Sequence, residues 1–191
     1  MGHFNNRSIV YLHGYGSSSK GEKPSLLREL FPQNRLLIPD LPLDPLACMN
    51  LCEDTLKTAS NDTIIVGASL GGFYAYYLAA KYKKDCLLIN PVYQPALEAK
   101  KLLEAETNLE KKKIILNAAN MYLSYRSNLN SLSHPKNCFV ALGKKDTIID
   151  PEVSSLHFAD AYVKMYEDDH YMLKSFAGIM KEFEDYLEER F

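Results

Sequence analysis

The chain of 191 residues is long enough for one domain with a buried core. Hydrophobic residues make up 47% and charged residues 24%, which is typical of a globular domain in water. The formal net charge is −2 and no long basic run is present, so the composition gives no support for nucleic-acid binding. No apolar run approaches the roughly 20 residues that a membrane helix needs, so no membrane association is expected.

The amino-terminal residues 1–7 are polar and lack the charged start and apolar core of a signal peptide. The four cysteines, Cys48, Cys52, Cys86 and Cys138, form no Cys-x-x-Cys pair, and the last two lie inside apolar runs. We therefore expect free thiols and a cytoplasmic protein.

Short apolar runs alternate with helical patterns along the whole chain. Four of the apolar runs are almost continuous, as in strands that are buried on both faces. The alternation predicts an α/β fold whose mostly parallel sheet of about six strands is covered by helices on both faces. The expected strands are 8–12, 36–38, 63–66, 86–89, 138–142 and 162–166. The expected helices are 22–30, 45–59, 70–82, 98–113, 114–126, 151–158 and 172–189.

One connection, residues 91–136, is much longer than the dozen or so residues that a plain crossover needs. Its composition is helical, so we interpret it as a small helical lid inserted into a single domain of residues 1–191. Because it follows the carboxyl end of a strand, it is expected near the place where open α/β sheets bind ligands. Met121, Tyr122 and Tyr125 could line the substrate pocket or could serve ordinary helix packing.

The segment 67–71 has the pattern Gly-x-Ser-x-Gly between an expected strand and an expected helix. This context favours a turn that projects the hydroxyl of Ser69, with small neighbours that avoid clashes in a strained backbone. The helix that follows directs its positive N-terminal end towards the serine. The alternative is a glycine-rich turn in which Ser69 only caps the helix.

A serine nucleophile needs a positioned base, and in this class of fold the base follows the nucleophile and the acid along the chain. His134, His157 and His170 all come after Ser69. His134 precedes a strand next to a proline, and His157 falls inside a short helix. His170 lies in a loop after the last expected strand, so we assign it as the general base.

The acid is expected in the loop after strand 138–142, where Asp146 and Asp150 are the candidates. Asp150 precedes a proline and a glutamate at a helix start, so N-capping explains its presence. Asp146 has no such structural task, and we assign it as the acid that orients His170. Asp168 and Asp169 are expected to be solvated loop acids.

Acyl transfer also needs two N–H donors for the developing oxyanion. We expect them to be the backbone amides of Leu70, which follows the nucleophile, and Tyr15, in the loop after the first strand. His13 is interpreted as a residue that shapes this loop.

Residues 16–21 of the same loop have the Gly-x-x-x-x-Gly spacing of a phosphate-binding loop. The residues that should follow are Lys and Ser or Thr, whereas Glu22 and Lys23 stand there, so nucleotide binding is rejected.

The chain resembles the YqiA-like family of small bacterial esterases, a reduced branch of the α/β-hydrolase superfamily. The resemblance covers nearly the whole chain and is carried by residues 11–14, 17–18, 38–42, 67–75, 90–91 and 146–150. It implies a carboxylesterase or thioesterase without a cofactor, with Ser69, Asp146 and His170 at the triad positions.

These observations predict a serine hydrolase that cleaves small carboxylic esters or thioesters through an acyl-enzyme, with no cofactor and no metal. The expected partner is a small-molecule acyl ester or thioester. The alternatives are an acyltransferase, in which an alcohol or amine replaces water, and a hydrolase-like protein that only binds a ligand.

Overall fold

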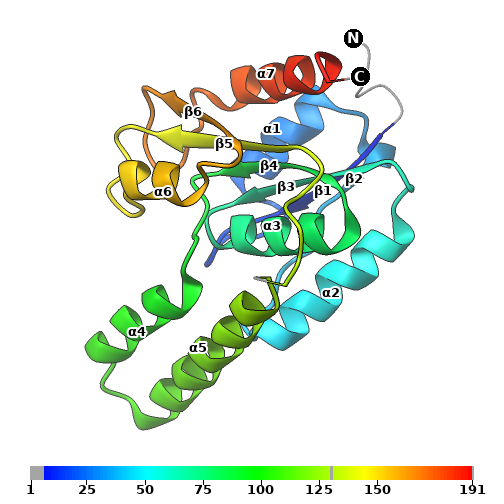
Figure 1. Cartoon of the computed structure of the whole chain (residues 1–191). Helices are drawn as coiled ribbons and strands as arrows, with labels where there is room; N and C mark the ends of the chain where they lie inside the picture. The colour runs from blue at the N-terminus through cyan, green and yellow to red at the C-terminus, as the bar shows by residue number, and fades with distance from the viewer. Residues whose placement is uncertain (1–6, 130, 191) are drawn as a thin grey trace.

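The computed structural model describes residues 7–129 and 131–190. Their six strands form one parallel sheet in the order β2-β1-β3-β4-β5-β6, with helices on both faces (Figure 1). The strands are β1 (Ser8–Leu12), β2 (Leu36–Leu37), β3 (Thr63–Ala68), β4 (Asp85–Ile89), β5 (Cys138–Gly143) and β6 (Tyr162–Tyr166). The helices are α1 (Glu22–Leu30), α2 (Pro45–Thr58), α3 (Leu70–Tyr82), α4 (Pro95–Ala105), α5 (Leu109–Leu129), α6 (Pro151–His157) and α7 (Phe176–Glu188). The predicted α/β architecture is confirmed.

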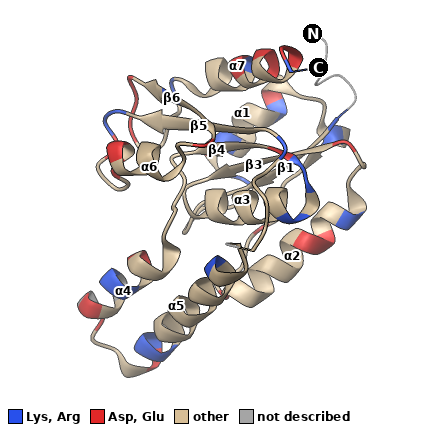
Figure 2. Ribbon diagram, in the orientation of Figure 1, with Lys and Arg blue, Asp and Glu red and all other residues tan. Residues whose placement is uncertain are grey.

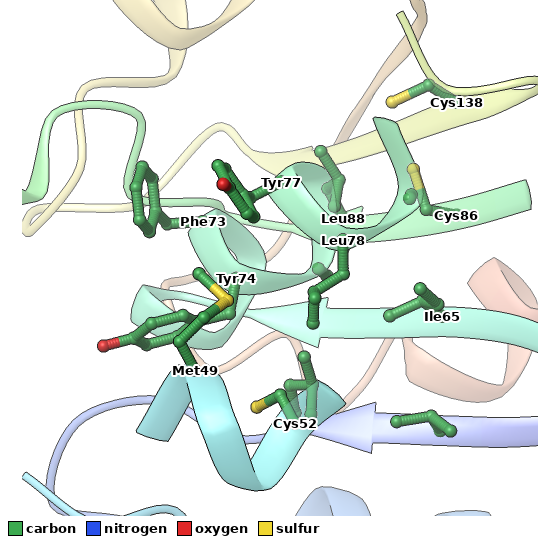
Figure 3. Close-up of a cluster of buried hydrophobic side chains, with 14 of the residues drawn as sticks. Met49, Cys52, Ile65, Phe73, Tyr74, Tyr77, Leu78, Cys86, Leu88 and Cys138 are labelled. Carbon is green, nitrogen blue, oxygen red and sulfur yellow. The ribbon is translucent and has the colours of Figure 1, made fainter. Parts of the chain in front are cut away.

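Each central strand contributes side chains to two hydrophobic layers, because successive residues of a strand point to opposite faces. Ile9 and Tyr11 of β1 pack on the face covered by α1 and α7. Val10 and Leu12 pack on the face covered by α2 and α3. Figure 3 shows part of this second layer, where side chains of α2 and α3 meet those of β3 and β4. Burial on both faces explains why these strands are almost continuously apolar.

The direction of the chain across the sheet reverses after β2. The chain goes from β1 to β2 at one edge and then crosses to β3 on the other side of β1. The loops after β1 and β3 therefore diverge at the carboxyl edge of the sheet and leave a crevice between them, which is where open α/β sheets bind ligands. The loops after β5 and β6 begin at the same carboxyl ends of the strands, because the strands are parallel.

The helical part of the long connection differs from the prediction in where it breaks. The sequence analysis placed the break between residues 113 and 114, whereas α4 ends at Ala105 and α5 begins at Leu109. The Oδ1 atom of Asn108 accepts hydrogen bonds from the N–H groups of Glu110 and Lys111, at 3.0 Å each. Asn108 therefore caps α5, and such a side-chain cap stabilises a helix start by about 1 kcal/mol.

The carboxyl-terminal helix begins at Phe176, four residues later than the predicted start at Met172. Met172 has φ +53°, a left-handed conformation that a helix does not continue through. The N–H of Ser175, directly before the helix, donates to the carboxylate of Asp168. The chain between the last strand and α7 is therefore an ordered turn rather than a first helical turn.

Charged residues of both signs are interspersed on α2, α4, α5 and α7, as Figure 2 shows. The four cysteines are buried free thiols. Within residues 7–129 and 131–190, no helix combines the length and the apolar composition that crossing a membrane requires.

Candidate active site

Ser69 occupies the turn between β3 and α3 with φ +52° and ψ −123°, a conformation that costs about 1–3 kcal/mol for a residue other than glycine. Three backbone hydrogen bonds hold this residue in place. Its N–H donates to the carbonyl of Ile89 at 3.0 Å, and its carbonyl accepts from Gly72 at 2.9 Å and Val92 at 3.0 Å. The strain is thus imposed by the ends of two neighbouring strands and by α3.

The glycines on either side of Ser69 are required by close packing. A Cβ atom on Gly67 would overlap the carbonyl oxygen of Gly71, and one on Gly71 would overlap the carbonyl oxygens of Leu12 and His13. Without these side chains, α3 lies directly against the ends of β1 and β3. The spacing of the Gly-x-Ser-x-Gly pattern therefore has a packing cause in this structure.

The structure brings together the three residues that the sequence analysis assigned to a triad. The Nε2 atom of His170 lies 3.2 Å from the hydroxyl oxygen of Ser69, and its Nδ1 atom lies 2.7 Å from a carboxylate oxygen of Asp146. These residues come from the loops after β6, β3 and β5. A base within hydrogen-bond distance of a hydroxyl, itself oriented by a carboxylate, is the arrangement that activates a serine.

Asp146 is held rigidly by the loop that carries it. One carboxylate oxygen accepts hydrogen bonds from the N–H groups of Ile148 at 2.8 Å and Ile149 at 2.9 Å, which leaves the other oxygen for His170. The Asp146 side chain is fully buried, so its charge is shielded from water. Asp150, the other candidate acid, accepts from two backbone N–H groups at the start of α6, as an N-cap does.

Asn90, directly after β4, is a site residue whose role the sequence analysis did not identify. Its Nδ2 atom donates to the carbonyls of Asp169 and His170 at 3.1 Å each, and its Oδ1 atom accepts from the N–H of Gly143 at 2.8 Å. It is 1% exposed and has φ +41°. One buried amide thus ties the histidine loop to the end of β5. The Asn-Pro pair at 90–91 indicates a turn, but nothing in the sequence indicates which groups the Asn90 amide hydrogen-bonds to.

The expectation that Asp168 is a solvated loop acid is wrong, since this residue is 5% exposed. Its two carboxylate oxygens accept from the N–H groups of Asp169 and Ser175, at 2.9 Å each. Burial raises the pKa of Asp168, but these hydrogen bonds outweigh that effect and hold the pKa below its ordinary value. The carboxylate therefore shapes the loop that carries His170.

We expect Asp168→Asn to lower the free energy of unfolding at pH 7 by about 1–2 kcal/mol, because the charge-assisted hydrogen bonds are lost. A carboxyl whose pKa is lowered by folding contributes stability above its unfolded pKa of about 3.9 and loses it as the pH falls through the folded value. Urea unfolding at pH 7 and below pH 4 measures the difference between wild type and variant, which should shrink in acid.

The control for this variant is Glu167→Gln, which removes an exposed carboxylate from the same loop. Glu167 is paired only with the exposed Lys144 and Lys145 among the described residues, so its loss should change stability much less than the loss of the buried Asp168 carboxylate does. Equal destabilisation by the two variants, or a difference that persists in acid, would contradict the role assigned to Asp168.

The two amides expected in the oxyanion hole belong to the start of α3 and to the loop after β1. Leu70 is the first residue of α3, and Tyr15 belongs to the loop after β1, where Gly14 packs directly against Ser69. A Cβ atom on Gly14 would lie 3.0 Å from that of Ser69. Neither the Leu70 nor the Tyr15 N–H donates to another described residue. N–H groups without a protein partner near a serine hydroxyl are able to bind a developing oxyanion.

The loop after β1 is fixed by contacts with the loop after β2. The N–H of Leu41 donates to Nε2 of His13 at 3.0 Å, so Nδ1 of this ring carries the proton that it shares with the carbonyl of Gly14 at 2.9 Å. The carboxylate of Asp40 accepts from both the N–H and the hydroxyl of Ser19. The loop that resembles a phosphate-binding loop therefore has two of its hydrogen-bond donors, both on Ser19, already bonded to the carboxylate of Asp40.

A cavity of about 660 Å³ contains both Ser69 and His170. This volume lies in the range of small-molecule sites. The wall is formed by the loop after β1, the start of α1 and the loops after β5 and β6. Tyr15 also lines a second cavity of about 260 Å³, together with Leu41, Leu43 and Tyr74, among others.

The helical insertion does not contribute to the wall of the cavity that contains Ser69, as far as its described residues go. Tyr122 packs edge-to-face on Phe73, and its hydroxyl lies 3.1 Å from that of Tyr74. Tyr125 packs in the same way on Tyr77. Of the two interpretations of these aromatic residues, the structure favours helix packing, here of α5 on α3.

In the described parts of the chain, no group of three or more His, Cys, Asp or Glu side chains is placed to hold a metal ion.

The sheet order and the crevice position define an α/β-hydrolase fold, and solved structures agree. Alpha/beta hydrolase domain-containing protein 10 from mouse has a TM-score of 0.68 and 17% identity, over 97% of this chain and 91% of that one. Est1E from Butyrivibrio proteoclasticus has a TM-score of 0.67 and 14% identity, over 96% and 87%. S-formylglutathione hydrolase from Staphylococcus aureus has a TM-score of 0.62 and 15% identity, over 93% and 84%.

The model of uncharacterised protein family UPF0227 matches residues 8–188. The chain therefore belongs to this family, and the resemblance to the YqiA-like proteins is confirmed.

Proposed function

We propose that this protein is a serine hydrolase that cleaves small carboxylic esters or thioesters. The observation that carries the proposal is the hydrogen-bonded series from Ser69 through His170 to Asp146, with Nε2 of the histidine 3.2 Å from the serine hydroxyl. The relatives with this fold include an esterase and an enzyme named for a thioester substrate, S-formylglutathione, which is consistent with acyl chemistry.

In the proposed mechanism, the hydroxyl oxygen of Ser69 attacks the acyl carbon while Nε2 of His170 takes the hydroxyl proton. Asp146 keeps the proton of the neutral imidazole on Nδ1 and stabilises the imidazolium that forms. The N–H groups of Leu70 and Tyr15 bind the oxyanion of the tetrahedral intermediate. His170 then gives its proton to the departing alcohol or thiol, which leaves an acyl group on Ser69.

Water completes the reaction. His170 takes a proton from a water molecule, whose oxygen attacks the acyl-enzyme, and the proton then returns to the oxygen of Ser69 as the carboxylic acid departs. No step of this sequence needs a cofactor or a metal ion. The strained turn and the start of α3 hold Ser69 in the position that both attacks require.

A fluorophosphonate probe tests the proposal, because it reacts with an activated serine hydroxyl. We expect the probe to label the wild-type protein and Ser69→Ala to abolish the labelling. Hydrolysis of a panel of p-nitrophenyl and acyl-CoA substrates should disappear with the same substitution. Labelling that survives Ser69→Ala would contradict the assignment of the nucleophile. No turnover of any substrate would favour a protein that only binds a ligand.

Product analysis in the presence of added alcohols and amines separates hydrolysis from acyl transfer. We expect the free carboxylic acid as the main product even with an acceptor present. The described part of the helical insertion does not line the cavity that contains Ser69, and this cavity opens beside exposed residues such as Tyr15 and Tyr171. Water therefore has direct access to an acyl group on Ser69.

A further inference from the structure

A lysine lies in the wall of the cavity that contains Ser69 and His170, and the mechanism above does not use it. Lys23 is the second residue of α1, and its side chain is partly buried. Within residues 7–129 and 131–190, no hydrogen bond or ion pair to its ammonium group is found. The side chain of Lys23 therefore lines the same cavity as Ser69 and His170 without a counterion in contact.

The acidic residues around Lys23 act on it from a distance. Burial lowers the pKa of the Lys23 amine, while the charges of Glu22, Asp169 and Asp168 partly oppose this shift. The carboxylate of Asp168 is occupied by two backbone N–H groups, and that of Asp169 accepts from the N–H groups of Tyr171 and Met172. None of these acids makes a hydrogen bond to the Lys23 ammonium group.

A neutral ester would leave the Lys23 ammonium group in this state, whereas a substrate oxyanion would give it a charge-assisted hydrogen bond. We infer that Lys23 binds an anionic group of the substrate, so that the preferred substrates are esters or thioesters that carry a carboxylate or a similar oxyanion. This inference rests on the proposed function and specifies its substrate class.

The remainder of the cavity fits such a molecule. Its wall includes the apolar side chains of Ile148 and Leu173 and the ring of Tyr171, next to His170. At about 660 Å³ the cavity holds an acyl group and an alcohol portion together. The N-terminal dipole of α1 acts in the same direction as the lysine charge, since it also favours negative charge. Among the described lining residues Lys23 is the one lysine or arginine; the wall also includes Glu22 and the hydroxyl-bearing Ser17 and Ser18, so the positive charge of Lys23 is local and would orient the charged end of a substrate.

Two matched pairs of esters test the inference and cover both positions of the charge. In the first pair the charge is on the acyl part: the p-nitrophenyl monoester of glutaric acid against p-nitrophenyl pentanoate. In the second it is on the leaving group: 4-carboxyphenyl acetate against phenyl acetate. The quantity measured is the ratio of kcat/KM for the charged ester to that for the neutral ester, compared between variants. This comparison cancels the different intrinsic reactivities of the esters.

We expect Lys23→Met and Lys23→Gln to lower this ratio by about tenfold or more in at least one pair, as the loss of a hydrogen bond between charged groups does. Lys23→Arg should restore much of the ratio, because it keeps the charge. Lys20→Met is the matched control, since it removes an exposed lysine that precedes α1 and lies outside the cavity wall. Its ratio should equal that of the wild type.

The inference is overturned if the ratios of wild type and both neutral Lys23 variants agree in both pairs while the neutral esters are hydrolysed. A lysine that only supported the cavity wall would give this result, because both esters of a pair would be affected alike. Failure of the proposed function has a different signature, namely no hydrolysis of any of the four esters by the wild type. That result would overturn the proposed function and this inference together.

Discussion

His170→Ala is expected to lower kcat/KM for an activated ester by about 1,000-fold or more, because the serine hydroxyl loses the base that takes its proton. In the structure no other described histidine hydrogen-bonds to Ser69. His13 is occupied by Gly14 and Leu41, and His134 by Tyr76. The release of p-nitrophenol from a p-nitrophenyl ester measures the effect, and circular dichroism verifies that the variant is folded.

Asp146→Asn should produce a loss of similar size, about 1,000- to 10,000-fold, through the tautomer of the histidine. The Oδ1 atom of an asparagine still accepts from the N–H groups of Ile148 and Ile149, so the loop keeps its shape. Its NH₂ group then faces Nδ1 of His170 and makes that atom an acceptor. The ring proton moves to Nε2, which consequently cannot accept the proton of Ser69.

Asp150→Asn is the matched control for Asp146→Asn. Asp150 lies in the same loop and caps α6, so its replacement affects the stability of that helix by about 1 kcal/mol or less and leaves the histidine untouched. We expect near wild-type kcat/KM for this variant. If Asp150→Asn reduced kcat/KM as strongly as Asp146→Asn, the assignment of the acid would be wrong.

The second large effect is expected for Asn90→Ala, which should lower kcat/KM by about 10- to 100-fold and the free energy of unfolding by about 2–4 kcal/mol. The substitution leaves the N–H of Gly143 and the carbonyls of Asp169 and His170 without their partner in a buried position. The loop that carries His170 is then no longer tied to β5. A displacement of that loop lengthens the distance between the histidine and the serine.

Asn137→Ala separates the two effects of Asn90→Ala. Asn137 donates a hydrogen bond of 2.8 Å to Asp85. Both residues lie at the amino-terminal ends of their strands, whereas Ser69 lies at the carboxyl-terminal ends. Its loss should reduce stability, as measured by urea unfolding, without changing kcat. If Asn90→Ala were as active as Asn137→Ala at equal stability, the amide of Asn90 would have no part in positioning His170.

The three residues of the proposed triad could be selected from the sequence because each has a local signature, and the structure places their side chains within hydrogen-bond distance. Ser69 is flanked by glycines between an apolar run and a helical pattern, and Asp146 and His170 follow expected strands in the required order. Asp150 could be set aside since a proline at the start of a helix explains it. The parallel sheet could be predicted as well, because burial on both faces produces continuous apolar runs.

The residues that support the site could not be predicted, since their partners are distant in the chain. Asn90 bonds to residues at 143 and 169–170, and nothing near Asn90 indicates those carbonyls and that N–H. Asp168 stands among other acidic residues, which is typical of a solvated loop, although its carboxylate is buried by the start of α7. The aromatic residues of α5 have the spacing of a helix face, and spacing alone does not tell what that face covers.

The four residues from Ile89 to Val92 serve both as the base of the helical insertion and as the support of two reactive loops. Ile89 and Val92 bond to the backbone of Ser69, and Asn90 bonds to the loop of His170. Tolerance of length change is consequently uneven along the insertion. The turn at residues 106–108, between α4 and α5, can gain or lose residues without reaching Ser69. A single residue added between 89 and 92 would shift Ser69 and His170 relative to each other, so we expect insertions and deletions to be tolerated only at the far end of the insertion.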